Sequence, residues 1–443
     1  MNKHIKVAPP RKLDRWSGII GLALFAGVCH AAPNDLKTTV QEVLQGHPEV
    51  REIQETWRAT QTEIAQAEGG KRPIIDFRGA YGGERTDDRS IVSTSVDRVR
   101  SDAELKLVLP LYDGGLTRAE VSVANHRTDG DFHRIDTTGQ VIALRVIRAF
   151  LDVLQERELF TIARQSETAF DRHRQNERSR LDGGFGSIAD FEQAVSRHAL
   201  SQVRTTDAQE QVERASTGYR SEVGDAPGDL TMPALQDHGR FSDFNQAMAL
   251  AKSQHPLLRL QKTEIDVSSA EQTAAGAPMR PKLNLEANVL ATNDAGGFNG
   301  KEYDARMQMV VRWNLYNGGR DRQRLRKAAF NVDVAQQAYA VSYRAVEQEL
   351  RLAFSSLKAN QDNANRLQKR LNSSRKVLDA YASERRLGSR SSLDLLTAET
   401  DLFNAETDAA TVRYNILFDQ YRLLAASGQL LDEFSVELQV LDD

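Results

Sequence analysis

The sequence has only one cysteine, Cys29, which lies near the start of the 443-residue chain. A single cysteine cannot form a disulfide bond within the chain, so a disulfide-stabilised scaffold is excluded. Long hydrophobic runs are also missing: no uninterrupted apolar stretch reaches about eighteen residues, the length that a membrane-crossing helix requires. The sequence therefore predicts neither a disulfide framework nor a helical membrane span.

Recognisable catalytic motifs are absent as well. An enzyme needs a convergent set of nucleophile, base or metal ligands, and the sequence shows no such pattern. The one glycine cluster, at 183–186, lacks the Gly-Lys-Ser/Thr ending of a phosphate-binding loop and is better interpreted as a turn between helices. We therefore predict no enzymatic activity and no cofactor.

A secretory signal is predicted at residues 1–31. Five basic residues precede the apolar run 18–28, and small residues follow it at the expected cleavage site near Ala31. Cleavage there removes Cys29; an alternative is a lipid-modified Cys29, although Val28 is bulkier than such a site usually accepts. Loss of five basic residues and one acidic residue takes the net charge from −4 to −8, which disfavours nucleic acid as a partner.

The remaining sequence contains an internal repeat. A His-Pro pair and an Arg-Pro pair recur 208 positions later, whereas a Leu-Tyr-Asp/Asn-Gly-Gly turn and a Gly-x-x-Ser-x-x-Asp segment recur 204 positions later. The spacing predicts two repeats, residues 32–217 and 241–427. A connector rich in Gly and Pro, 218–240, joins them, and a tail, 428–443, follows the second repeat.

Each repeat contains two runs in which apolar and polar residues alternate with the period of a β-strand. The runs are 75–81, 102–111, 281–290 and 303–315. Three of them approach the length that a tilted strand needs to cross a bilayer, and aromatic residues lie near the strand ends, as in a membrane girdle. A soluble half-buried sheet is the alternative, but the strongly charged helices offer no apolar layer to cover it. Lipid is the expected cover for a face that includes Leu107 and Leu285.

Four strands cannot close a barrel, and unpaired strand edges are not tolerated in hydrocarbon. Three copies of the chain would supply twelve strands, an even number within the range of outer-membrane barrels. Two copies would supply eight, and an eight-stranded barrel is filled by its own side chains. We therefore expect a homotrimer surrounded by outer-membrane lipid.

Two proline-free segments, 116–181 and 320–387, predict helices far longer than those of globular domains. Each would extend roughly 100 Å at about 1.5 Å per residue. Apolar residues recur at coiled-coil spacing in parts of these segments, and charged residues interrupt the pattern elsewhere. This is typical of the wall of a hollow helical tube; a soluble coiled-coil rod is the alternative, but it would not explain the strands. The strand-to-helix turns are predicted at Gly114, Gly115, Gly318 and Gly319.

Shorter helical stretches, 36–68 and 243–275, precede the strands of each repeat. His47 and His255 lie within them, each directly before a proline. Because proline is favoured at the first position of a helix, we interpret both histidines as helix-start residues. They are not predicted to bind a metal, since no cluster with ligand spacing accompanies them.

The signal, the doubled His-Pro and Arg-Pro pairs, the Gly-Gly turns and the Gly-x-x-Ser-x-x-Asp segments resemble the TolC-like outer-membrane factors over nearly all of the mature chain. The resemblance implies a mainly α-helical fold with four strands per chain, in which a trimeric twelve-stranded β-barrel is continued by a long periplasmic helical barrel. The connector and the tail would form an equatorial belt. It also implies a passive duct that docks an inner-membrane ABC or other transporter through a periplasmic adaptor protein.

Two cargo classes remain open within this resemblance. Type I protein secretion is preferred, on overall resemblance; the alternative is tripartite efflux of small molecules, and a periplasmic structural coiled-coil protein is a remote third possibility. The polar sides of the strands predict no strong selection by charge, because five acidic residues there oppose five basic ones. They are Asp76, Asp102, Glu104, Glu286 and Asp304 against Arg78, Lys106, Lys282, Arg306 and Arg312.

The resemblance further implies a gate at the periplasmic end, where Gly184 and Gly388 mark the expected helix-hairpin turns. Asp394 matches a position that lines the constriction in the family, and Arg390 and Asp190 match a pair that ties hairpins together. A second acidic position that is often present one turn on is threonine here, so we expect a single carboxylate ring. The alternative is ordinary surface charge, since exposed ion pairs contribute only about 0–1 kcal/mol.

Overall fold

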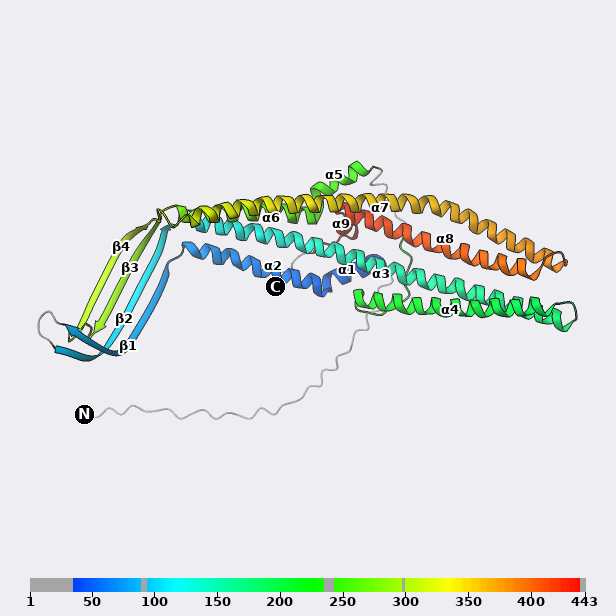
Figure 1. The fold of residues 1–443 in the computed structure, drawn as a ribbon, viewed down its shortest axis with the longest axis horizontal. Coiled ribbons are helices and arrows are strands. Elements are labelled where there is room, and N and C mark those ends of the chain that lie inside the picture. Colours follow the sequence, from blue (N-terminus) through cyan, green and yellow to red (C-terminus); the bar gives the residue numbers. More distant parts are fainter. Residues whose placement is uncertain (1–34, 89–93, 235–242, 297–298, 439–443) are drawn as a thin grey trace, which may run out of the picture.

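The computed structural model describes residues 35–88, 94–234, 243–296 and 299–438. The predicted signal segment 1–31, with Cys29, lies outside these residues, as does part of the connector. The described chain is elongated: a small sheet forms one end, and paired long helices run from it to the opposite end (Figure 1). We refer to this opposite end, where the helices turn back, as the tip.

The two repeats contain the same elements in the same order, as predicted. The first comprises α1 (Leu36–Gly46), α2 (Pro48–Glu68), the short 3₁₀ turn η1 (Gly69–Lys71), β1 (Ile74–Asp88), β2 (Thr94–Tyr112), α3 (Leu116–Asp182) and α4 (Ile188–Val223). The second comprises α5 (Phe244–Gln254), α6 (Pro256–Gly276), η2 (Ala277–Met279), β3 (Lys282–Asn293), β4 (Lys301–Arg312), α7 (Arg320–Arg386) and α8 (Ser392–Ser427), and α9 (Leu430–Phe434) follows it. Since α3 and α7 each contain 67 residues, both hairpins end at the same tip.

The two histidines that precede prolines divide each shorter helical stretch into two helices. The ring Nδ1 of His47 accepts a hydrogen bond from the backbone N–H of Glu49, and that of His255 accepts one from Leu257, both at 3.2 Å. A proline is the first residue of each following helix. The interpretation of both histidines as helix-start residues is therefore confirmed.

The four strands form one antiparallel sheet in the order β1-β2-β3-β4. Its register aligns apolar residues in rows across one face, such as Phe77–Leu105–Val289–Ala305 and Ile75–Leu107–Ala287–Met307. The row between them, Asp76–Lys106–Asn288–Arg306, is polar and belongs to the other face. Because successive side chains alternate between faces, the sheet has one apolar side and one polar side, as the period-two pattern predicted.

Several element boundaries differ from the prediction. Strands β1 and β2 are longer than expected, because polar residues continue the hairpin beyond the alternating runs; Arg100, for example, pairs with Glu84 at 3.0 Å. Helix α4 continues to Val223, so the predicted connector, 218–240, begins inside a helix. Tyr219 explains the extension, since its ring is fully buried and lies 6.4 Å from that of Phe150.

The main hydrophobic core lies at the middle of the long helices. There α3 packs against α1, α8 and α9, and its buried residues include Ile147, Phe150 and Leu151. The connector also contacts α3, because Arg157 donates a 2.7 Å hydrogen bond to the carbonyl of Gly228. Helices α1, α5 and α9 thus lie beside the long helices at mid-length (Figure 1).

Within the described ranges, none of the helices combines the length and the apolar character that crossing a membrane requires.

Candidate functional site

Glycines make the turns between strand and helix. Gly114 and Gly115 follow β2, Gly318 and Gly319 follow β4, and all four have φ between 74° and 88°, a left-handed conformation that favours glycine. The Gly114 turn is additionally held by Arg280, whose Nη1 donates a 3.0 Å hydrogen bond to the carbonyl of Gly114. The two sheet hairpins are therefore joined at the point where the helices begin.

Alanine substitutions at these turns should destabilise the protein by amounts that differ between the two repeats. A Cβ on Gly114 would lie 2.7 Å from the backbone oxygen of Ala277, whereas a Cβ on Gly318 would meet no atom within 4 Å. Gly318→Ala should therefore lower the free energy of unfolding only by the cost of placing alanine in a left-handed conformation, about 1–2 kcal/mol. Gly114→Ala should cost at least about 1 kcal/mol more, because the clash involves backbone. Thermal denaturation of the two variants checks this, and equal losses would contradict it.

At the tip, the two hairpin turns have the same design. Gly184 and Gly388 adopt φ of 76° and 82°. Three residues further on in each repeat, a serine hydroxyl caps the next helix by accepting a hydrogen bond from the backbone N–H of Asp190 (3.0 Å) or Asp394 (3.1 Å). Both aspartates therefore lie in the first turn of a helix, where a negative charge is favourable.

The structure gives Arg390 partners in its own hairpin. Its Nε donates a 2.7 Å hydrogen bond to Glu384, its Nη1 lies 3.8 Å from the carboxylate of Asp394, and its guanidinium lies 4.2 Å from the ring centre of Tyr381. The carboxylate of Asp190 instead accepts a hydrogen bond from the Ser187 hydroxyl. Among the described residues of this one chain, Arg390 and Asp190 form no ion pair, so their predicted tie is not made within a protomer.

A different ion pair joins the two hairpins. Arg385 of α7 donates a 2.8 Å hydrogen bond from Nη2 to Oε1 of Glu177 on α3, and the two side chains are only 16% and 7% exposed. Nη1 of Arg385 also donates to the carbonyl of Arg390. Arg385 thus links the first hairpin to the turn of the second.

Sequence reasoning missed this pair. The residues are 208 positions apart in the sequence, and each lies in a segment rich in exposed charge. No periodic signal separates Glu177 from its neighbours, because only the folded packing buries it. The tie is recognisable from the low exposure of both partners, which distinguishes it from the many surface pairs.

An apolar contact also joins the hairpins, about two turns of α3 away from this ion pair. Phe170 of α3, Ala194 of α4 and Leu396 of α8 form a small buried cluster. Beside it, Nε2 of His173 lies 3.6 Å from the carboxylate of Glu399. The hairpins are therefore packed together near the tip by both apolar and polar contacts.

Large apolar side chains are exposed at the tip. Phe185 and Leu387, in the two turns, are each 84% exposed, and Ile188 at the start of α4 is 70% exposed. Large apolar residues that cluster at an exposed end are a common mark of an interaction surface.

Comparison with known protein families identifies the class of this protein. A family model described as "Outer membrane efflux protein" matches residues 39–224 and 247–429, one segment for each repeat. The chain belongs to the outer membrane efflux protein family, is similar to TolC-like outer-membrane factors, and is an outer-membrane protein.

Individual relatives and structures agree with this assignment. The chain is 25% identical over 341 residues to the outer membrane efflux protein BepC of Brucella suis biovar 1 (strain 1330), covering 75% of this chain and 73% of BepC. It is 21% identical to TolC of Escherichia coli (strain K12), covering 94% and 86%, and 21% identical to the proteases secretion protein PrtF of Dickeya chrysanthemi, covering 86% and 85%. The crystal structure of VceC from Vibrio cholerae has the same fold, with a TM-score of 0.77 at 15% identity over 89% of this chain and 96% of VceC.

Proposed function

We propose that three copies of this chain form a passive exit duct that crosses the outer membrane and extends into the periplasm. The sheet is the main support for this proposal. Its apolar face is exposed. Its two edge strands, β1 and β4, each pair on one side only among the described strands. Edges of this kind in lipid require partner strands. Joining β4 of one copy to β1 of the next around a three-fold axis supplies them.

The helical part also has an exposed apolar surface, on α7. Exposed apolar residues follow one face of α7 at spacings of four, seven and eleven residues: Phe330, Val334, Val341 and Leu352, which are 48–66% exposed. Such spacings keep side chains on one stripe of a helix. Within the chain α7 contacts mainly α6 and α8, and we assign the stripe to the neighbouring copy in the trimer.

Protein secretion through a type I system is the proposed transport role. The similarity to PrtF, whose name states protease secretion, favours it. Small-molecule efflux is the second candidate, because the similarity to the efflux protein BepC extends over most of both chains. A periplasmic structural coiled coil would lack the apolar sheet face, so membrane fractionation discriminates that alternative. No part of the proposed role requires an enzymatic step or a cofactor.

Identification of the inner-membrane partner tests which class of cargo the duct transports. Crosslinking in intact cells, followed by purification of this protein, should recover a periplasmic adaptor together with an ABC transporter in the secretion case. Deletion of the gene should then leave a secreted protein inside the cells. Recovery of a drug transporter, with increased sensitivity to small toxic compounds and unchanged protein secretion, would replace secretion by efflux.

The tip is the proposed contact for the adaptor and the proposed gate. Exposed Phe185, Ile188 and Leu387 would pack on apolar residues of an adaptor. In the closed duct, Glu177 and Arg385 hold the two hairpins of each copy together, and we assign the tie between Arg390 and Asp190 to neighbouring copies. Three copies of Asp394 would then form a carboxylate ring at the constriction.

The ring predicts how divalent cations act on the duct. Three like charges attract cations strongly, so Asp394→Ala should weaken the block of single-channel current by Mg²⁺ at least several-fold while the resting duct stays closed. Planar-bilayer recordings with increasing Mg²⁺ measure this, and Asp207→Ala, at an exposed site on α4, is the control. An unchanged Mg²⁺ block in the Asp394→Ala protein would remove this residue from the constriction.

A further inference from the structure

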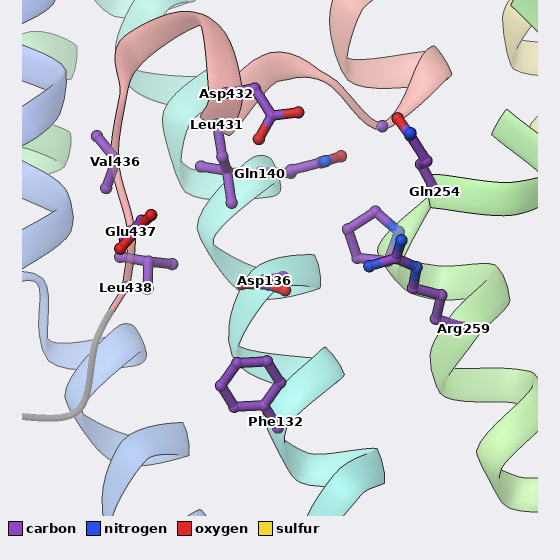
Figure 2. Close-up of a pocket in the computed structure, with 12 residues that line it drawn as sticks. Phe132, Asp136, Gln140, Gln254, Arg259, Leu431, Asp432, Val436, Glu437 and Leu438 are labelled. Atoms are coloured by element: carbon purple, nitrogen blue, oxygen red, sulfur yellow. The ribbon is translucent and has the colours of Figure 1, made fainter. Parts of the chain in front are cut away.

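A polar cleft of about 470 Å³ lies at mid-length of the helical part. It is bounded by α3, by the junction of α5 and α6, and by the segment that follows α8 (Figure 2). Asp136 and Gln140 point into it from α3, and Asp432 points into it from α9. Gln254 and Arg259 face them from the opposite wall.

Two carboxylates in the cleft have no partner. Among the described residues, the side chains of Asp136 and Asp432 take part in no hydrogen bond and no ion pair. Burial raises the pKa of Asp136 to about 6, the charge of Arg259 acts in the opposite direction, and the charge of Asp432 raises the pKa further. The two carboxylates therefore repel each other, and Arg259 offsets only part of the cost of charging Asp136.

Gln140 provides an independent observation. Its side chain is only 6% exposed, it lines the cleft, and no hydrogen-bond partner occurs for its amide in the described part of the chain. The amide atoms are not among the fully buried side-chain atoms that lack a partner, so the amide opens into the cleft. An amide that opens into a cleft beside two unpaired carboxylates offers a ligand a third acceptor.

We propose that this cleft binds a small primary ammonium compound, whose N–H groups donate to Asp136, Asp432 and the Gln140 carbonyl. An ammonium group carries three donors and no acceptor, which matches three acceptors on two separate elements. The two unpaired carboxylates face one guanidinium, that of Arg259, so the field of the cleft attracts a cation. The Arg259 guanidinium is held back by the 3.2 Å hydrogen bond of its Nε to the carbonyl of Ser253.

The ligand would fasten the C-terminal segment to α3. This segment already fits closely: a Cβ on Gly428 would lie 2.7 Å from the backbone of His255, and Gln41 donates a 2.8 Å hydrogen bond to the carbonyl of Phe434. An ammonium between Asp136 and Asp432 adds a link between the two elements. Binding should therefore raise the thermal stability of the detergent-solubilised protein.

Calorimetric titration with putrescine, a small diamine, tests the proposal on the full-length protein in detergent. Saturable binding at pH 7 should be at least tenfold weaker in Asp136→Asn and in Asp432→Asn, and unchanged in the surface variant Asp207→Asn. Since Asp136 is ionised above pH 6 and protonated below it, wild-type affinity should fall about tenfold from pH 7 to pH 5. Asp136→Asn should lose most of that pH dependence, and tetramethylammonium, which has no N–H group, should not compete.

Three results would overturn the proposal: no binding and no thermal shift at millimolar putrescine, equal affinity in the wild type and both carboxylate variants, or competition by tetramethylammonium. Asp432 is exposed, so Asp432→Asn tests the site even where substitution of the half-buried Asp136 prevents folding. Transport activity plays no part in these readouts. A failed result here would therefore leave the duct proposal untouched.

Discussion

Arg385→Ala should open the tip of the assembled duct and raise its conductance strongly. The substitution removes the closer basic partner of the buried Glu177 and leaves it Arg180, whose Nε lies 3.9 Å away; breaking a buried ion pair from one side costs about 3–5 kcal/mol. In the proposed open form the hairpins separate and Glu177 is exposed to water. The substitution therefore destabilises the closed form relative to the open form. A shift of about 3 kcal/mol changes the ratio of open to closed ducts by more than about a hundredfold.

Planar-bilayer conductance measures the effect. Arg386→Ala is the matched control, because Arg386 is exposed and, among the residues that the structure describes, its guanidinium bonds only to Ser383. Glu177→Ala should open the duct as well, and the double variant should open it no further than the more open single variant, since both residues serve one interaction. Arg390→Ala and Asp190→Ala test the tie between copies in the same assay. Intact trimers of Arg385→Ala with wild-type conductance would show that this pair does not hold the gate.

Leu107→Arg should strongly reduce the amount of folded protein. Leu107 lies in the apolar row with Ile75 and Ala287, and an arginine facing lipid near the bilayer centre costs about 2–4 kcal/mol. The cost occurs once per chain, so a trimer bears it three times. Leu285→Arg, on the same face of β3, should behave in the same way.

The neighbouring residue provides the control for this substitution. Val108 lies on the opposite face of β2 and pairs with Glu286 of β3, so Val108→Arg places the new charge in water beside a carboxylate. Heat-resistant trimer in membrane extracts, measured for each variant, should be lost for Leu107→Arg and largely kept for Val108→Arg. Equal loss in both variants would mean that the assignment of the lipid face is wrong.

Much of the fold follows from local sequence patterns. Period-two alternation located all four strands because each side of the sheet has a uniform environment. The repeated His-Pro pairs located two helix starts, since a cap and a first-turn proline act within a few residues. Absence of proline over long segments indicated both long helices, and their observed bounds differ from the predicted ones by one residue.

The contacts at the tip follow much less from sequence. The turns at Gly184 and Gly388 were located because glycine in a left-handed conformation is a local requirement. The partner of Arg390 depends on which of several nearby carboxylates the hairpin brings closest, and Glu384 is that group. The pair of Glu177 and Arg385 exists only because two helices from different repeats pack together, and no pattern within either helix reports it.

The central claim is that this chain completes its sheet only with two further copies. Native mass spectrometry of the protein in mild detergent tests it directly, because the number of chains in the intact particle is read from its mass. We expect three chains, which supply twelve strands and leave no free edge among β1 and β4. A monomer or a dimer as the intact species would contradict the barrel, and with it the proposed duct.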